Sequence, residues 1–312
     1  MLRKTLRRLL PIQLRHEVIA LREILKDGWR YQRATNEGAR WSRRESHGEQ
    51  HEARLTMDYH RIEKGLALPA PKQPFGAGVK ERMLLLLRQR SNPESTGRYI
   101  QLSEEALAAL DRWNASGEID DTVTPVLEQD PAALDQRTAD FFFNSRHSIR
   151  NFDLNKVPTL DELLHGVALA RNTPSVCNRQ AFRVHIFRER AHIDEILRIQ
   201  NGATAFAHTI PALGVVTARR AMFVGPDERN QRWVDGGLFA MTLVWAWHAV
   251  GLSTCMLNWA LPNSSSDKLR RLADIPHGDD IVVLIAIGHT SPRARVARSE
   301  KRSLDDLVIL HS

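Results

Sequence analysis

The chain has 312 residues, of which 42% are hydrophobic, so it is long enough for one large domain or two smaller ones. Lys and Arg number 44 against 37 Asp and Glu, and the net charge is +7, but no stripe of interleaved basic and aromatic residues occurs, which argues against nucleic-acid binding. The two cysteines, Cys177 and Cys255, cannot form a disulfide framework or a Cys-x-x-Cys site, so we expect a reducing, cytoplasmic location.

The N-terminal segment combines positive charge with regularly spaced leucines. Arg and Lys interrupt it every few residues, so we expect neither a signal peptide nor a membrane span. Leu2, Leu6, Leu9 and Leu10 have helical spacing among basic residues, which would allow weak contact with an anionic membrane surface. We favour the alternative, in which these leucines pack against the protein itself, because Pro11 ends the pattern.

The rest of the N-terminal half is mainly helical in pattern. Residues 34–53 show little periodicity and predict a loop or a disordered, flexible segment. Amphipathic patterns predict helices over 78–91 and 103–116, the second with Ser103 as its N-cap. We place a domain boundary at about residue 140, so that 1–140 forms a mainly helical N-terminal region.

From residue 141 onward, helical and extended patterns alternate along the chain. The predicted strands cover 182–188, 211–218, 253–257 and 279–290, and the predicted helices cover 159–172, 192–202, 233–252 and 265–275. The last strand is apolar almost throughout, so we place it at the centre of a sheet. This pattern predicts an α+β domain over 141–312, with a central mixed sheet and helices on both faces.

Arg146, Ser148 and Arg150 occupy alternate positions after three consecutive phenylalanines. On an extended segment such side chains point to one side, where two guanidiniums and a hydroxyl can bind a phosphate or a carboxylate. We call these three residues the arginine fork. The phenylalanines are expected to hold the fork at the edge of an apolar core, where charges are less screened. The alternative is that both arginines form ion pairs with Asp140 and Asp153.

Three later segments also carry polar or basic groups. The turn at 174–180 places hydroxyl and amide side chains on a loop, where ligand contacts are common, although ordinary turns favour the same residues. Segment 251–262 leaves a long apolar helix and includes Asn258 and Trp259. The basic tail at 293–310 can add positive charge to an anion site, but alone it is typical of a solvated tail.

Together and in this order, the segments resemble the nitroreductase family of FMN-dependent oxidoreductases. The resemblance covers about half of the chain, and it is carried by "RHSIRNF" (146–152), "PSVCNRQAF" (174–182), residues 235–259, "VVLIAIGHT" (282–290) and "KRSLDDLV" (301–308). Residues 58–76 resemble an extension of nitroreductase-like proteins associated with polysaccharide biosynthesis. The resemblance implies a nitroreductase-like fold preceded by a helical N-terminal extension.

The resemblance implies FMN as the cofactor. Arg146 and Arg150 would pair with the phosphate, and Ser148 would hydrogen-bond the phosphate or the ribityl chain. Arg302, and after it Lys301, would supply the further basic contact that the family places in its C-terminal tail.

The resemblance also assigns residues near the flavin ring. In the family, the turn reaches the flavin of the partner subunit; the corresponding residues here are Pro174, Ser175, Asn178 and Gln180. Ala181 and Phe182 stand where a proline and a tryptophan are usual, so this sequence departs from the pattern there. A backbone N–H faces flavin N5 in the family, and that segment maps to Leu257, Asn258 and Trp259. Asn258 replaces an acidic residue of several members, which a backbone contact tolerates.

The activity implied is an NAD(P)H:acceptor oxidoreductase with a ping-pong mechanism. NADH or NADPH would reduce the flavin, and an electron-poor acceptor would reoxidise it, with a link to polysaccharide biosynthesis. No metal site and no catalytic side chain are expected, because flavin N5 carries the hydride. The alternative function is a catalytically silent flavin-binding or scaffold protein beside a membrane-associated glycan assembly system.

The active site is expected between the two subunits of a homodimer. Helix 233–252 supports this, because Leu238, Met241 and Trp245 lie on faces that one small domain could not bury alone. The alternative is a helix buried entirely within its own chain.

Overall fold

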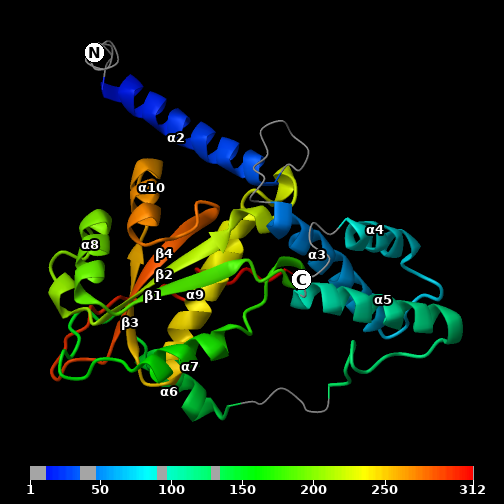
Figure 1. Cartoon of the computed structure of the whole chain (residues 1–312). Coiled ribbons are helices and arrows are strands. Elements are labelled where there is room, and N and C mark those ends of the chain that lie inside the picture. The colour runs from blue at the N-terminus through cyan, green and yellow to red at the C-terminus, as the bar shows by residue number, and fades with distance from the viewer. Residues whose placement is uncertain (1–11, 36–46, 90–96, 128–133, 312) are drawn as a thin grey trace.

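The computed structural model describes residues 12–35, 47–89, 97–127 and 134–311. A sheet domain with helices on both faces stands beside a group of N-terminal helices (Figure 1). The N-terminal helices are α2 (Ile12–Thr35), α3 (His47–Leu66), α4 (Ala77–Arg88) and α5 (Arg98–Ser116). The sheet domain contains α6 (Gln136–Ser145), α7 (Leu160–Ala170), β1 (Phe182–Phe187), α8 (Arg190–Gln200), β2 (Ala212–Arg219), α9 (Gln231–Ala249), β3 (Ser253–Asn258), α10 (Asn263–Leu272) and β4 (Asp279–Gly288).

The four strands form one sheet in the order β1-β2-β4-β3, which confirms the central position of the apolar last strand. Every pair of neighbouring strands is antiparallel, so the expectation of a mixed sheet is wrong for these strands. The chain between β1 and β2 returns to the end of the sheet that it left, so that Phe187 lies opposite Leu213. Among the described residues, parallel pairing is limited to an isolated bridge between Ser148 and Thr254.

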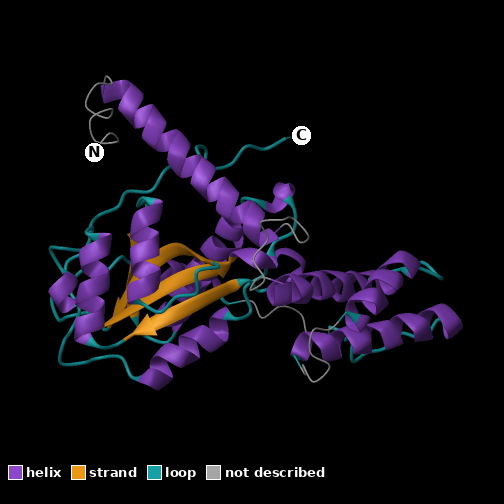
Figure 2. Ribbon diagram, turned by 45° about the horizontal axis from the view of Figure 1, so that its top comes forward, coloured by secondary structure: helices purple, strands orange, loops and turns teal. Residues whose placement is uncertain are grey.

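Each face of the sheet is covered by helices, as the sequence predicts (Figure 2). One core lies between the sheet and α8 and α10, and the other lies between the sheet and α7 and α9. In the second core the Trp247 indole of α9 donates to the carbonyl of Leu163 at 3.1 Å. Gly166 makes this close approach possible, because a Cβ there would lie 2.1 Å from the Trp247 ring.

The starts of two predicted helices differ in how well they match the sequence. Thr159 caps α7, the helix predicted over 159–172, and forms a reciprocal capping box with Glu162. Ser103 is not an N-cap, and that prediction is wrong. α5 already begins at Arg98, because buried Ile100 extends the apolar face upstream, and the Ser103 hydroxyl donates to the carbonyl of Tyr99 at 2.7 Å.

The N-terminal helices have a small core of their own, between α3, α4 and α5. Residues 34 and 35 end α2 and residues 47–53 begin α3, within the segment expected to be a loop; 36–46 lie outside the described residues. The basic leucine pattern at residues 2–10 also lies outside them. α6 spans residue 140, and the division of the chain there remains a prediction.

Within the described residues, no helix has the length and apolar character needed to cross a membrane.

Candidate functional site

The arginine fork lies on a segment that is bonded to the ends of two strands. Ile149 N donates to Thr254 O of β3 at 3.0 Å, and Asp153 N donates to His289 O, beyond β4, at 2.9 Å. Buried Ile149 and Phe152 anchor the same segment in the core beneath α8 and α10. The segment that carries the fork is therefore held at the start of β3, with Ile149 buried between Ser148 and Arg150.

Both guanidiniums of the fork are without a carboxylate partner among the described residues. Arg146 is half-buried, with its guanidinium carbon 5.7 Å from the centre of the Trp245 ring. Arg150 is exposed, and its one hydrogen bond in the described part of the chain goes to the carbonyl of Ser148 at 3.5 Å. Asp153 instead accepts from Asn155 N at 2.9 Å, so the alternative of ion pairs with Asp140 and Asp153 is not what the described side chains form.

The charges of the two arginines influence titratable groups near the start of β3. Burial raises the pKa of the Cys255 thiol, and the positive charges of Arg150 and Arg146 oppose that rise. Burial also lowers the pKa of His248, and Arg146 and His147 lower it further. Burial is thus the larger influence on both pKa values, and the two arginines add a positive potential near the start of β3.

A small cavity of about 70 Å³ opens beside Arg146. Its lining residues are Ser145, Arg146, His147, Ile149, His248, Leu252, Ser253, Thr254 and Thr290. Hydroxyl groups are frequent there: Ser145 Oγ lies 2.9 Å from His248 Nε2, and Ser253 Oγ lies 2.6 Å from Thr290 Oγ1. A guanidinium among hydroxyls can bind an anion, which is the chemistry expected of the fork.

The three phenylalanines before the fork do not form a closed apolar cluster in the single chain. Phe142 packs against Trp245 and His248, with ring centroids 5.3 and 5.1 Å apart. Phe141 and Phe143 are 75% and 59% exposed. All three lie on helix α6, where consecutive side chains point about 100° apart and cannot all face one core. In the isolated chain, Phe141 and Phe143 therefore do not contribute to the apolar core expected beside the fork, whereas Ile149 and Phe152 do.

The segment expected beside flavin N5 lies at the opposite end of β3 from the fork. Leu257 and Trp259 are buried, and the Trp259 indole donates to Ser266 Oγ at 2.9 Å. Asn258 between them has an exposed side chain, and its carbonyl accepts from Gln200 at 3.1 Å. Four residues of extended strand separate Thr254 from Asn258, a distance of about 13 Å. The fork and Asn258 thus lie at opposite ends of β3.

The 174–180 turn has an unusual backbone. Cys177, Asn178 and Gln180 all have positive φ, at 49°, 52° and 46°. Such a backbone persists only when the surroundings hold it. The Ser175 hydroxyl accepts from Gln180 N at 2.9 Å, and Gln180 Nε2 donates to Asn178 Oδ1 at 3.1 Å.

Sequence reasoning missed the residues that hold this turn. Buried Asp235, from the first turns of α9, accepts from Val176 N at 3.2 Å and from Gln231 Nε2 at 2.8 Å. Burial raises the pKa of Asp235. Arg179 is also buried and forms two hydrogen bonds to the Glu228 carboxylate, at 2.9 and 2.8 Å. The sequence did contain one signal for Asp235, because it is an aspartate within an otherwise apolar helical pattern.

The turn and the fork lie at opposite ends of the sheet within one chain. The turn leads into Phe182, opposite Ala218 near the start of β4, whereas the fork lies beyond the end of β4. The ten residues of β4 span about 30 Å. One chain therefore does not bring the turn and the fork together.

The C-terminal tail stays exposed. Lys301 Nζ donates to Ser299 O at 2.9 Å, and Arg302 is exposed. Among the described residues, neither side chain is bonded to the fork.

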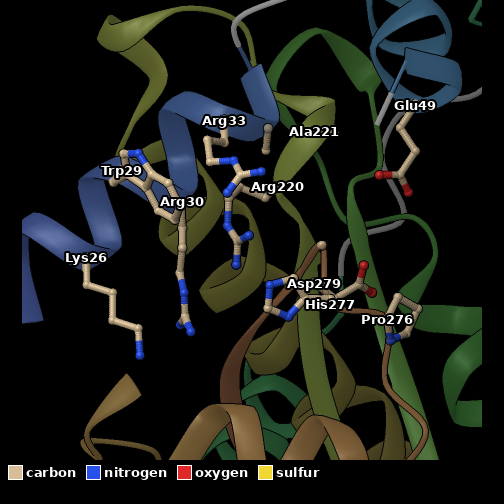
Figure 3. Close-up of a pocket in the computed structure, with 12 residues that line it drawn as sticks. Lys26, Trp29, Arg30, Arg33, Glu49, Arg220, Ala221, Pro276, His277 and Asp279 are labelled. Carbon is tan, nitrogen blue, oxygen red and sulfur yellow. The ribbon is translucent and has the colours of Figure 1, made fainter. Parts of the chain in front are cut away.

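A larger hollow of about 310 Å³ lies at the turn's end of the sheet, between α2 and the segment before β4 (Figure 3). Two of the cations that line it have acidic partners: Arg30 makes two 2.6 Å hydrogen bonds to Asp267, and Arg220 pairs with Asp280. This hollow marks where α2 docks and is separate from the fork.

Two comparisons relate the chain to known proteins. A model of the Nitroreductase family matches residues 144–289. A candidate nitroreductase from Bacillus subtilis superimposes with a TM-score of 0.51 at 16% identity, covering 56% of this chain and 100% of its own. A nitroreductase-like protein from Streptococcus mutans gives 0.48 at 16% identity, covering 56% and 99%. An FMN-dependent nitroreductase from Clostridium difficile gives 0.44 at 15% identity, covering 51% and 91%. A search of curated sequences gave no match.

Residues 144–289, which lie within the sheet domain, therefore match the nitroreductase family. The fold is the nitroreductase-like α+β fold, which confirms the class predicted from the sequence.

Proposed function

We propose that this protein is an FMN-dependent oxidoreductase that transfers electrons from NADH or NADPH to an electron-poor acceptor. The observation that carries the proposal is the arginine fork: two guanidiniums without acidic partners in the described part of the chain, beside a hydroxyl-lined cavity. An FMN phosphate is a dianion that such a group would neutralise.

The residues present fit the cofactor. Arg146 and Arg150 would hold the phosphate, and the Ser148 hydroxyl would bond it or the ribityl chain. Lys301 and Arg302 are free of the sheet and could approach the phosphate from the tail. In the closed site, the low dielectric beneath Ile149 and Phe152 would strengthen these contacts.

The ring would lie toward Leu257, Asn258 and Trp259, since β3 leads from the fork to them. When bound, FMN would supply the chemistry of accepting a hydride from a nicotinamide and passing it to the acceptor. The chain's own part would be to orient the ring through the Asn258–Trp259 backbone and to exclude water with the Trp259 side chain. With FMN supplying the chemistry and the chain orienting the ring, no acidic or basic side chain is needed at the ring.

We further propose a homodimer, with the 174–180 turn of one chain completing the site of the other. Pro174, Ser175, Asn178 and Gln180 would then contact the partner's flavin. The proposal is supported by the separation of the turn from the fork within one chain. It is also supported by the exposed apolar side chains near the fork and along α9, which need a cover: Phe141, Phe143, Val234 and Leu238.

A cytoplasmic location and a link to polysaccharide biosynthesis complete the proposal. The second point rests only on the resemblance of residues 58–76. The rival function, a silent flavin-binding or scaffold protein, would share the fork but not the turnover.

The test is anaerobic reduction of the purified, FMN-loaded protein. Adding NADH or NADPH should bleach the flavin absorbance, and a nitroaromatic or quinone acceptor should restore it. A protein that binds FMN but is not bleached by either nucleotide would support the silent scaffold instead.

A further inference from the structure

Helix α2 docks on the sheet domain through its charged side. Arg30 and Lys26 pair with Asp267 of α10 at 2.6 and 3.4 Å, and Asp27 pairs with Arg232 of α9 at 2.9 Å. Docking through a charged side is unusual, because an ordinary surface helix buries its apolar face.

The opposite side of α2 is apolar and open to solvent. Leu14, Val18, Leu21 and Leu25 are 42%, 51%, 57% and 63% exposed. At 100° per residue they fall within one stripe, about 180° away from Asp27 and Arg30, and exposed Ile24 and Trp29 extend the apolar surface on either side of it. We call Leu14, Val18, Leu21 and Leu25 the α2 stripe. Figures 1 and 2 both show α2 running outward from the sheet domain, so no described segment of the same chain covers the stripe.

The spacing of the α2 stripe is that of paired helices. Its steps of four, three and four residues are the 3.5-residue repeat of a coiled coil, with Leu14 and Leu21 at d positions and Val18 and Leu25 at a positions. A β-branched residue at a with leucine at d favours two parallel strands.

The charges beside the stripe are complementary in the same arrangement. Glu17 falls at a g position and Arg22 at the following e position, and both are exposed. In a parallel pair, g of one helix faces that e of the other, so two Glu17–Arg22 pairs would form across a twofold axis.

We propose that the α2 stripe binds the α2 stripe of a second copy of this chain, with the two helices parallel. The sheet domains then lie on opposite sides of the helix pair, because each docks through the other side of its α2. The contact continues toward α9: exposed Ile24 and Trp233 line one hollow beside the stripe. The stripe lies outside the matched family region, residues 144–289, and the inference does not depend on flavin binding.

Cross-linking of single-cysteine additions tests the register. In a parallel pair, Leu21 of one copy faces Leu21 of the other, so Leu21→Cys should form a disulfide-linked dimer under mild oxidation. Ala20→Cys, exposed but off the stripe, is the matched control and should remain uncross-linked, as should the wild type with its own Cys177 and Cys255. Equal cross-linking of both variants, or none at position 21, would overturn the proposal.

Self-association gives a second test. Val18→Glu with Leu21→Glu should raise the dissociation constant of the association through α2, as distinct from the proposed flavin-site dimer, at least about tenfold by analytical ultracentrifugation, while Ala20→Glu should not. FMN content should stay unchanged in both, which separates this interface from the flavin site. Unchanged association of the double variant would contradict the proposal. So would preferential binding of the wild-type stripe to vesicles of anionic phospholipid.

Discussion

Ser148 and Thr254 are joined by a parallel backbone bridge, in which the amide that follows Ser148 donates to the Thr254 carbonyl at 3.0 Å. This bridge fixes the arginine fork to the start of β3. The other end of β3 carries Asn258, so one strand positions both ends of the proposed FMN site.

Removing the fork should release the cofactor without unfolding the chain. Each charge-assisted hydrogen bond contributes about 1.5–3 kcal/mol, so Arg146→Ala or Arg150→Ala should weaken FMN binding roughly 10- to 100-fold, and the double variant more. Fluorescence titration with FMN measures this. Arg112→Ala, which removes an exposed arginine paired with Asp120 in the N-terminal region, is the control and should bind normally. Loss of the cooperative melt in the fork variants would indicate a structural role instead.

The anchor of the 174–180 turn should act on the flavin site from a distance. Asp235→Ala leaves Val176 N and the Gln231 amide without their acceptor, which should lower the free energy of unfolding by about 1–3 kcal/mol. Amide hydrogen exchange should rise in residues 174–180, and FMN affinity should fall although the fork is intact. Asp235→Asn, which keeps one acceptor oxygen, should restore much of the protection. Unchanged amide hydrogen exchange in the alanine variant would show that the turn keeps its conformation without Asp235.

The buried carboxylate of Asp280 should be essential for stability. Arg220, Arg232 and Arg270 surround it, all within 3.4 Å. Asp280→Ala would leave three buried guanidiniums short of an anion, at a cost of about 3–5 kcal/mol. Chemical denaturation measures this. A loss below about 1 kcal/mol would mean that Asp267 and Asp27 compensate for the missing charge.

Asp280 also predicts how stability depends on pH. Burial acts to raise its pKa, but Arg220 and the other two arginines outweigh burial and hold the pKa below its ordinary value of 3.8. The carboxylate therefore stabilises the fold above that value, and this contribution is lost as the pH falls from there through the lower native pKa. Asp280→Asn should be less stable at neutral pH and show a flatter loss of stability in acid. If both proteins lose stability equally steeply as the pH falls, groups other than Asp280 cause that loss.

Gly166 should tolerate no side chain. A Cβ there would overlap the Trp247 indole, so Gly166→Ala should lower stability by about 1–3 kcal/mol through overpacking. Gly48→Ala is the matched control, because nothing lies within 4 Å of its Cβ position in α3. It should be neutral or slightly stabilising. Thermal melts of both variants test this prediction. Similar melting temperatures would show that the contact between residue 166 and Trp247 is not tight.

Much of the sheet domain could be predicted from local patterns. The helix after Thr159 and the strands at 182–187 and 279–288 follow from capping and hydrophobic periodicity, which act within a few residues. The arginine fork could also be proposed, since alternate spacing is a local property.

The remainder depends on contacts between distant residues. Nothing near Asp235 in sequence indicates that it holds Val176, 59 positions away. The antiparallel direction of the sheet depends on where the chain returns after α8. α2 docks through its charged side because Arg30 pairs with Asp267, which lies far away in the sequence. Such partners appear only once the fold is assembled.

The most direct measurement of the central claim is the absorption spectrum of the purified protein after incubation with FMN and removal of free ligand. The account predicts a yellow protein with about one FMN per chain, and loss of that absorbance when Arg146 and Arg150 are both replaced by alanine. A well-folded protein that stays colourless after FMN addition would contradict it.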